Sequence, residues 1–407
     1  MKQIFLFCLV IALGSCKEKE IYRFEVKEGD GILNAFPVAL ELYDFKNGLE
    51  GEYMIFDHGE PISSQWDGEG KKIWFLHHPD TKSSYSLEKV EKKRIPGPNL
   101  LASKAKRSLQ LSMEGNPLVQ YRYEMMYPPE GIDSLYKKSG FIHPLRTPKG
   151  DTLTRIQPPD HYHHYGLWGP WTHTQVDGER VDFWNLGEGM GTVLFKEFKE
   201  TSSGNVLTSF TATQEHIDLK TVNAPQVALN ENLKVQLWNL DRPDRYMLDY
   251  TTSFTSPLES GMLFEAYRYG GGIGLRFNER WHKDNCSVLT SEGKDRLTAD
   301  GSNARWCIVS GTSLDGQGTH GIVFLSHPKN RMHPEPMRIW PVDANGGRGD
   351  MFFEFCPIRH EEWKIEPDKT YELNYRMVVF DGELTAKEAE AYWQAFAEPP
   401  QVQIRKE

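Results

Sequence analysis

The stretch YMLDYTTSF at residues 246–254 alternates apolar and polar side chains, which predicts a β-strand with one buried face. The same pattern recurs on both sides of it. Further strands are predicted within 21–49, notably at 22–26 and 38–43, and at 71–76, 206–213, 233–240, 322–325 and 371–380. Gly-, Pro- and Asn-containing turns separate many of them, and there is no internal repeat of about 20–50 residues, which disfavours propellers and solenoids.

One helix is predicted, near the end of the chain. Thr385 and Glu388 have capping-box spacing, and apolar side chains follow at helical spacing: Ala389, Tyr392, Trp393 and Phe396. Pro399-Pro400 ends the pattern. Many short strands with one late helix predict an all-β sandwich, and since no linker divides the chain, residues 21–407 are interpreted as a single domain.

Composition excludes some classes of partner. The 407 residues carry a net charge of −10, with 39% hydrophobic and 26% charged residues. This balance is typical of a soluble globular protein. Nucleic-acid binding needs a clustered basic surface, so no nucleic-acid partner is expected.

The N-terminus predicts a lipoprotein. Residues 1–15 contain Lys2 and a short apolar run, and Leu13-Gly14-Ser15-Cys16 resembles a lipobox. We expect a signal peptide at 1–15, a lipidated Cys16, and a tether at 16–20. The mature protein would then be an outer-membrane lipoprotein facing the periplasm or cell surface, touching the membrane only through its lipid. An ordinary secretory signal is the alternative. The odd set Cys286, Cys307 and Cys356 favours buried free thiols.

Candidate functional residues concentrate between positions 146 and 184. The segment DHYHHYGLWGPWTH at 160–173 holds four of the 14 histidines, which are suited to proton transfer or to metal binding. On an extended backbone His161 and His163 would point to one face and His164 to the other. Trp168 and Trp171 could stack on sugar rings or lie in the core. Asp182 could orient a histidine, accept sugar hydroxyls or face solvent.

A second cluster follows at 264–277. Alternation places Glu265, Tyr267 and Tyr269 on one face, and Arg268 and Arg276 could pair with a substrate carboxylate or sulfate. The alternative is a glycine-rich bulge with ordinary surface charges. A third group of polar residues lies in turns beside strands, among them Arg305, His327 and Asn330.

Ordered motifs from about Tyr43 to Trp393 resemble one family. They are Arg146-Thr147-Pro148, Asp160-His161-x-His163-His164-x-Gly166-Leu167-Trp168, His173, Val181-Asp182-Phe183-Trp184, Tyr269-Gly270-Gly271, Ser291-Glu292-Gly293-Lys294, Ala304-Arg305-Trp306 and His327-Pro328-x-Asn330. The resemblance is to the bacterial PmoA-like family, which carries the label methane oxygenase and is common among Bacteroidota lipoproteins. Tyr165 stands where that family often has Arg.

The resemblance implies a β-supersandwich of the galactose-mutarotase type that accompanies polysaccharide-degrading enzymes. Lyases of that architecture need a base, an acid and a cation beside a uronate. His164 or His163 would be the base, Tyr267 the acid, and Arg268 or Arg276 the carboxylate partner. The preferred function is a dehydratase removing water from unsaturated uronate-ended oligosaccharides, as in ulvan breakdown. Further substrate contacts would come from Arg146, Trp168, Trp171, Asp182, Arg305, His327 and Asn330. Neither cofactor nor required metal is expected.

Four alternatives remain open. A mutarotase or epimerase would depend on Glu265 and one histidine. Glu265 with His173 is also the pair that would replace the His/Tyr assignment if that assignment failed. A glycoside hydrolase would need two carboxylates, Glu265 and Asp182. A non-catalytic glycan-binding lipoprotein would depend on the tryptophans. A metal-dependent enzyme would use His161, His163 and a third ligand such as His173.

The lipobox prediction can be tested by cell fractionation. A Cys16→Ala protein lacks the thiol that receives the lipid, so it should move from the membrane to the soluble fraction. Retention in the membrane would show that another segment anchors the chain.

Overall fold

The computed structural model describes residues 21–405, except 30, 32, 42–51, 68–70, 80–82 and 92–94. The predicted signal peptide, Cys16 and the tether lie outside the described residues. Within these limits, none of the helices has the length and apolar character needed to cross a membrane.

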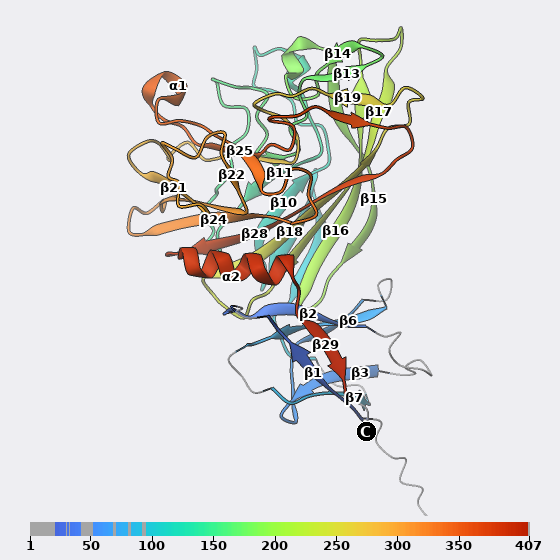
Figure 1. The fold of residues 1–407 in the computed structure, drawn as a ribbon, viewed down its shortest axis with the longest axis vertical. Helices are drawn as coiled ribbons and strands as arrows, with labels where there is room; N and C mark the ends of the chain where they lie inside the picture. The colour runs from blue at the N-terminus through green and yellow to red at the C-terminus, as the bar shows by residue number, and fades with distance from the viewer. Residues whose placement is uncertain are drawn as a thin grey trace, which may run out of the picture.

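Two large antiparallel sheets form the body of the molecule (Figure 1). The eight-stranded sheet has the order β15 (Gly191–Ser202), β16 (Leu207–Asp218), β17 (Gln226–Trp238), β18 (Arg245–Thr255), β28 (Tyr371–Asp381), β24 (Thr319–Ser326), β23 (Trp306–Thr312) and β21 (Cys286–Thr290). The nine-stranded sheet has the order β22 (Asn303–Ala304), β25 (Glu335–Ile339), β26 (Phe352–Phe355), β20 (Ile273–Arg276), β12 (Leu167–Trp168), β11 (Phe141–Leu145), β10 (Asn116–Arg122), β9 (Ser108–Met113) and β8 (Leu100–Ala105).

The two sheets share one hydrophobic core, as the predicted alternation requires. On β18, Leu248 and Tyr250 enter this core beside Ile142 and Leu275 of the other sheet. Met247, which precedes Leu248 on the same strand, belongs to a second core on the opposite face of the same sheet. The all-β prediction is therefore confirmed, and the architecture is a β-supersandwich.

Two small sheets cover part of the outer face of the eight-stranded sheet, at the lower end of Figure 1. The five-stranded sheet has the order β29 (Gln401–Ile404), β1 (Ile21–Lys27), β7 (Tyr85–Val90), β3 (Glu52–Asp57) and β4 (Glu60–Pro61). The three-stranded sheet has the order β2 (Phe36–Glu41), β6 (Lys72–His77) and β5 (Ser64–Asp67). Because the second core joins them to the sandwich, no separate boundary is evident, and the single-domain interpretation stays a prediction.

The C-terminal helix forms as predicted. It is α2 (Ala386–Ala397), with Thr385 as N-cap and Glu388 completing the capping box. Its residues Ala389 and Tyr392 are buried in the second core. The free-thiol prediction is also confirmed, since Cys286, Cys307 and Cys356 are buried and unpaired.

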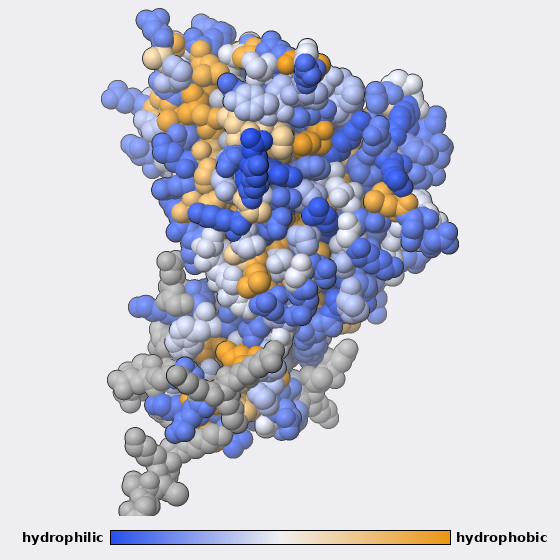
Figure 2. Space-filling model, turned by 180° about the vertical axis from the view of Figure 1, so that it is seen from behind, coloured by the Kyte–Doolittle hydropathy of each residue, from blue (hydrophilic) through white to orange (hydrophobic). Residues whose placement is uncertain are grey.

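A fifth sheet, of four strands, lies at the upper end of the molecule in Figure 1. Its order is β14 (Glu179–Val181), β13 (Thr174–Val176), β19 (Met262–Phe264) and β27 (Trp363–Ile365). The short helical turns are η2 (Ser134–Tyr136), η3 (Leu186–Glu188) and α1 (Ala344–Gly347). The rear surface of the molecule is mostly hydrophilic, with apolar side chains gathered in patches over its upper part (Figure 2).

Glu335 on β25 makes the stability of the fold depend on pH. Its carboxyl is fully buried and accepts hydrogen bonds from Tyr375 Oη (2.9 Å), Asn330 Nδ2 (3.0 Å) and Ser326 Oγ. Burial raises the pKa of Glu335 to about 7, although these hydrogen bonds oppose the shift. The folded state therefore holds a proton that the unfolded chain releases at a lower pH.

Glu335→Gln should remove this pH dependence. The stability from the raised pKa is fully present below the ordinary value of 4.5 and is lost as pH rises towards about 7. Relative to the variant, the wild-type free energy of unfolding should fall by about 3 kcal/mol over that interval, measured by urea denaturation. The exposed Glu130→Gln is the control. Parallel curves for wild type and Glu335→Gln would contradict the assignment.

Candidate functional site

The histidine segment forms a tight turn, so the extended arrangement expected for it is wrong. His161 N donates to the Pro158 carbonyl (2.8 Å), and His164 N donates to the His161 carbonyl (3.0 Å). Gln157 N donates to the His164 carbonyl (2.8 Å) and closes the loop. As a result His164 joins the other two rings instead of pointing away from them. The ring centroids are 5.3 Å (161–163), 4.7 Å (161–164) and 4.8 Å (163–164) apart.

His164 lies at the bottom of this cluster, enclosed by aromatic rings. It is 1% exposed, and four ring centroids lie 5.2–5.6 Å from its own: Trp168, Trp184, Trp340 and Phe352. Burial lowers the pKa of His164 well below its ordinary value and that of His163 to about 4. Both rings are therefore neutral at neutral pH, and His164 Nδ1 has no hydrogen-bond partner among the described residues.

A chain of hydrogen bonds through Asp160 and the buried Arg276 supports the histidine turn. His161 Nδ1 lies 2.8 Å from Asp160 Oδ2, and Arg276 of β20 donates from one nitrogen to Asp160 (2.8 Å) and Asp350 (2.6 Å). Burial opposes ionisation of Asp160, but hydrogen bonds from His161 and Arg276 hold its pKa well below the ordinary value. Arg276 is fully buried and its guanidinium lies over the Trp340 ring. Both carboxylates are bound by this one nitrogen, whereas Nε and Nη1 are buried without a hydrogen-bond partner among the described residues. Arg276 is thus already paired with two protein carboxylates, and its contact with a substrate carboxylate stays a prediction.

A second, more exposed group lies on the small upper sheet. β13 and β19 pair at Thr174 and Phe264, and Glu265 N continues the ladder by donating to the His173 carbonyl (2.9 Å). The His173 ring stacks on Tyr267 with centroids 3.7 Å apart and planes at 9°. His173 Nδ1 lies 3.9 Å from Glu265 Oε2. Three residues expected from the sequence thus meet at one half-buried place.

Tyr269 connects the two groups. Its ring lies 5.9 Å from Tyr267 and 5.2 Å from Trp184, and Trp184 also contacts His163 at 5.8 Å. The Tyr269 hydroxyl accepts hydrogen bonds from Arg338 (2.9 Å) and Trp340 Nε1 (3.2 Å). A continuous row of rings therefore runs from His173 to His164.

No role was predicted from the sequence for Arg338, Trp340 or Trp184. Arg338 is the last residue but one of β25 and lies two positions before Trp340, so strand alternation places both on the face that meets Tyr269. The two-residue spacing of Arg338 and Trp340 is the sequence feature that could have indicated their shared face. The exposed Arg268, which was predicted, lies beside this row with its guanidinium 5.4 Å from the Tyr269 centroid.

Both predicted stacking tryptophans are buried. Trp171 lies in the main core against Phe254 and Phe264, and Trp168 is 3% exposed beneath His164. Neither can offer a ring face to a sugar from solvent. Their predicted role in substrate binding is therefore corrected to packing.

Other predicted substrate residues lie elsewhere in the fold. Arg305 pairs with Glu390 of α2 (3.1 Å), and the His327 ring packs on Phe396. Asn330 is buried and bridges Glu335 and Asn374. Arg146 donates to the Pro117 carbonyl (3.4 Å), and its own carbonyl accepts from Tyr246 of β18. These contacts are made away from the histidine turn.

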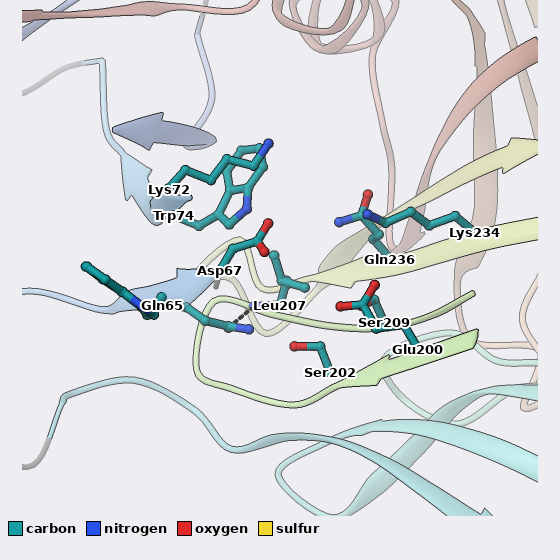
Figure 3. Close-up of a pocket in the computed structure, with 11 residues that line it drawn as sticks. Gln65, Asp67, Lys72, Trp74, Glu200, Ser202, Leu207, Ser209, Lys234 and Gln236 are labelled. Atoms are coloured by element: carbon teal, nitrogen blue, oxygen red, sulfur yellow. Dashed lines mark hydrogen bonds between the residues drawn. The ribbon is translucent and has the colours of Figure 1, made fainter. Parts of the chain in front are cut away.

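A separate polar groove lies between the three-stranded sheet and strands β15–β17 (Figure 3). Its volume is about 300 Å³, and Gln65 at its edge accepts from Leu207 N (2.9 Å). The residues that line it are Gln65, Trp66, Asp67, Lys72, Trp74, Glu200, Ser202, Leu207, Ser209, Lys234 and Gln236. Because this lining includes no predicted site residue, the groove is distinct from the candidate site.

Asp182 positions the Trp184 side of the site. It is fully buried and accepts five hydrogen bonds, from Thr172, Arg180, Trp184 N, Asn185 N and Asn185 Nδ2. These bonds outweigh burial and hold the pKa of Asp182 below its ordinary value. Its role is therefore to fix the loop after β14 rather than to contact a substrate.

The fold and this ring-lined site define a β-supersandwich protein with a histidine turn on one sheet. The chain belongs to DUF6807, a family of unknown function whose pattern matches residues 108–394. That match begins at β9 and ends within α2, so it covers both large sheets except the edge strand β8. No curated protein matches the sequence. The resemblance to the PmoA-like family stays a prediction.

The solved structures to which the chain is similar include the following three. One is a protein in the glycosyl hydrolase family 38 from Enterococcus faecalis (TM-score 0.46, 10% identity, 95% of this chain and 47% of that chain). A second is heparan sulfate lyase from Pedobacter heparinus (0.33, 10%, 71% and 36%). The third is a galactose mutarotase related enzyme from Lactobacillus acidophilus (0.32, 9%, 70% and 100%). The chain thus spans about half or less of the first two proteins.

Asp182→Ala should destabilise the protein strongly. The change leaves Arg180 and two backbone N–H groups without their buried acceptor, so the free energy of unfolding should fall by about 3–5 kcal/mol in urea denaturation. The neighbouring, exposed Glu179→Ala is the control and should stay within about 0.5 kcal/mol of wild type. Equal stability of the two variants would contradict a positioning role for Asp182.

Proposed function

We propose that the protein is a carbohydrate-active carbon–oxygen lyase in polysaccharide degradation. The preferred reaction is removal of water from an unsaturated uronate-ended oligosaccharide. The observation that carries the proposal is the half-buried group of His173, Tyr267 and Glu265 beside the exposed Arg268. The protein would act as a lipid-anchored outer-membrane protein facing the periplasm or cell surface.

Elimination of water needs three functions in one place. A base removes a proton from the ring carbon next to the one that carries the leaving hydroxyl, a new C=C bond forms as the C–O bond breaks, and an acid gives its proton to the leaving hydroxyl, so that water departs. A cation pairs with the substrate carboxylate and holds the sugar in place. The geometry supports His173 as the base, Tyr267 as the acid and Arg268 as the cation, with Glu265 orienting His173.

This assignment moves the base away from the histidine turn. His164, expected as a base, is 1% exposed and enclosed by four rings, which leaves its nitrogens out of reach of a sugar. His163 is half-buried and remains the better candidate within the turn. Arg276 is replaced by Arg268 because its charge is already shared by Asp160 and Asp350.

Two rival functions differ in how well the contacts support them. A glycoside hydrolase needs two carboxylates flanking the sugar bond, and Asp182 is buried with its oxygens occupied by five donors. A mutarotase or epimerase is the second candidate, because the 3.9 Å approach of Glu265 to His173 also suits an acid–base pair acting on a sugar ring.

Mass spectrometry of the products separates these functions. We expect incubation with uronate-ended oligosaccharides, saturated and unsaturated, to lower the mass of an unsaturated substrate by one water. Two smaller fragments would instead indicate a hydrolase or a chain-cleaving lyase. Unchanged masses with an altered anomer ratio would indicate a mutarotase, and unchanged masses with binding alone would indicate a glycan-binding protein.

On a confirmed substrate, Tyr267→Phe keeps the stacked ring and removes only the acidic hydroxyl. The rate should therefore fall by about 10²–10⁴-fold. Tyr123→Phe, a half-buried tyrosine packed on Phe195 and Phe198, is the matched control and should keep wild-type turnover. Normal turnover of Tyr267→Phe would remove the acid assignment.

A further inference from the structure

The histidine turn offers more than the proposed acid–base chemistry uses. One ring nitrogen from each of His161, His163 and His164 can be chosen so that all three lie within 4.8 Å of one another. We propose that these three side chains form a binding site for one divalent transition-metal ion, with Zn²⁺ as the best-fitting occupant. The proposal does not depend on the reaction proposed above.

The spacing of the rings fits a single metal ion. Three imidazoles around a tetrahedral zinc, with Zn–N of about 2.0–2.1 Å, place their ring centroids about 5 Å apart. The observed separations are 4.7, 4.8 and 5.3 Å. The turn therefore holds the rings at the required distance. The nitrogens lie within 4.8 Å of one another, and metal binding would turn the side chains until the nitrogens are about 3.3 Å apart.

The hydrogen-bond partners of the histidine rings also support a metal site. Asp160 binds His161 Nδ1 and leaves Nε2 for a metal, which is the carboxylate–histidine arrangement common behind zinc ligands. His164 Nδ1 is buried without a hydrogen-bond partner in the described part of the chain. A buried polar atom without a partner is costly, and a metal ion at this place would supply one.

Charges of both signs lie beside the rings. Arg276 is buried and pairs with Asp160 at 2.8 Å and with Asp350 at 2.6 Å, and Asp350 also pairs with Arg155 at 3.6 Å and with Arg348. His173, considered from the sequence as a third ligand, instead stacks on Tyr267, and His164 takes that place. Three neutral nitrogen ligands select zinc-like ions over Mg²⁺ or Ca²⁺, which prefer oxygen. A fourth position would remain for water or a substrate carboxylate.

The test measures metal, not turnover. Untagged protein residues 21–407, stripped with a chelator and dialysed, should bind one Zn²⁺ per chain with a Kd below about 1 µM in competition with a chromophoric chelator. Bound Zn²⁺ should also raise Tm, whereas Mg²⁺ should leave it unchanged. These experiments measure bound metal and not turnover, so their result does not depend on whether a lyase activity is found.

Variants locate the site. His161→Ala and His163→Ala should each abolish stoichiometric binding, and Asp160→Asn should weaken it by about 10–100-fold through His161. The exposed His360→Ala is the control and should bind as wild type does. Circular dichroism confirms that each variant is folded, and Asp160→Asn serves if a histidine variant is not. Absence of stoichiometric binding, or equal binding by His163→Ala and wild type, would overturn the proposal.

Discussion

Arg276 is the buried cation on which the candidate site depends. It belongs to β20 in the nine-stranded sheet. Its guanidinium binds Asp160 in the histidine turn and Asp350 just before β26, and it lies over the Trp340 ring. Three separate segments are thus fixed to one side chain. Removing one member would leave an uncompensated charge in an apolar setting, which is far costlier than losing a surface ion pair.

Around this centre, two kinds of histidine environment lie at opposite ends of one row of rings. His164 is enclosed by tryptophan and phenylalanine side chains, whereas His173 is half-buried beside a carboxylate and a phenol. The enclosed ring can only act as a neutral ligand or packing group. The half-buried ring can exchange protons with a bound molecule, so the two ends suit different chemistry.

Local features were predictable from the sequence, and contacts between distant segments were not. Alternation within β18 and capping at Thr385 each depend on a few neighbouring residues. Glu265 with His173 was predicted only as an alternative catalytic pair, and the structure brings the two side chains within 3.9 Å. Three other contacts could not be predicted from the sequence. Arg276 pairs with two carboxylates, Trp171 is buried in the core, and Arg305 pairs with Glu390 of α2. These outcomes depend on how the sheets stack.

The pairing of β1 with β29 has a consequence for how the chain folds. Phe24 lies opposite Ile404, so the first described strand completes its sheet with almost the last residues of the chain. A nascent chain emerging from a ribosome would expose one edge of β1 until synthesis is nearly finished, and such an edge is a template for association with other chains. C-terminal truncation would make that exposure permanent while leaving the site residues in place.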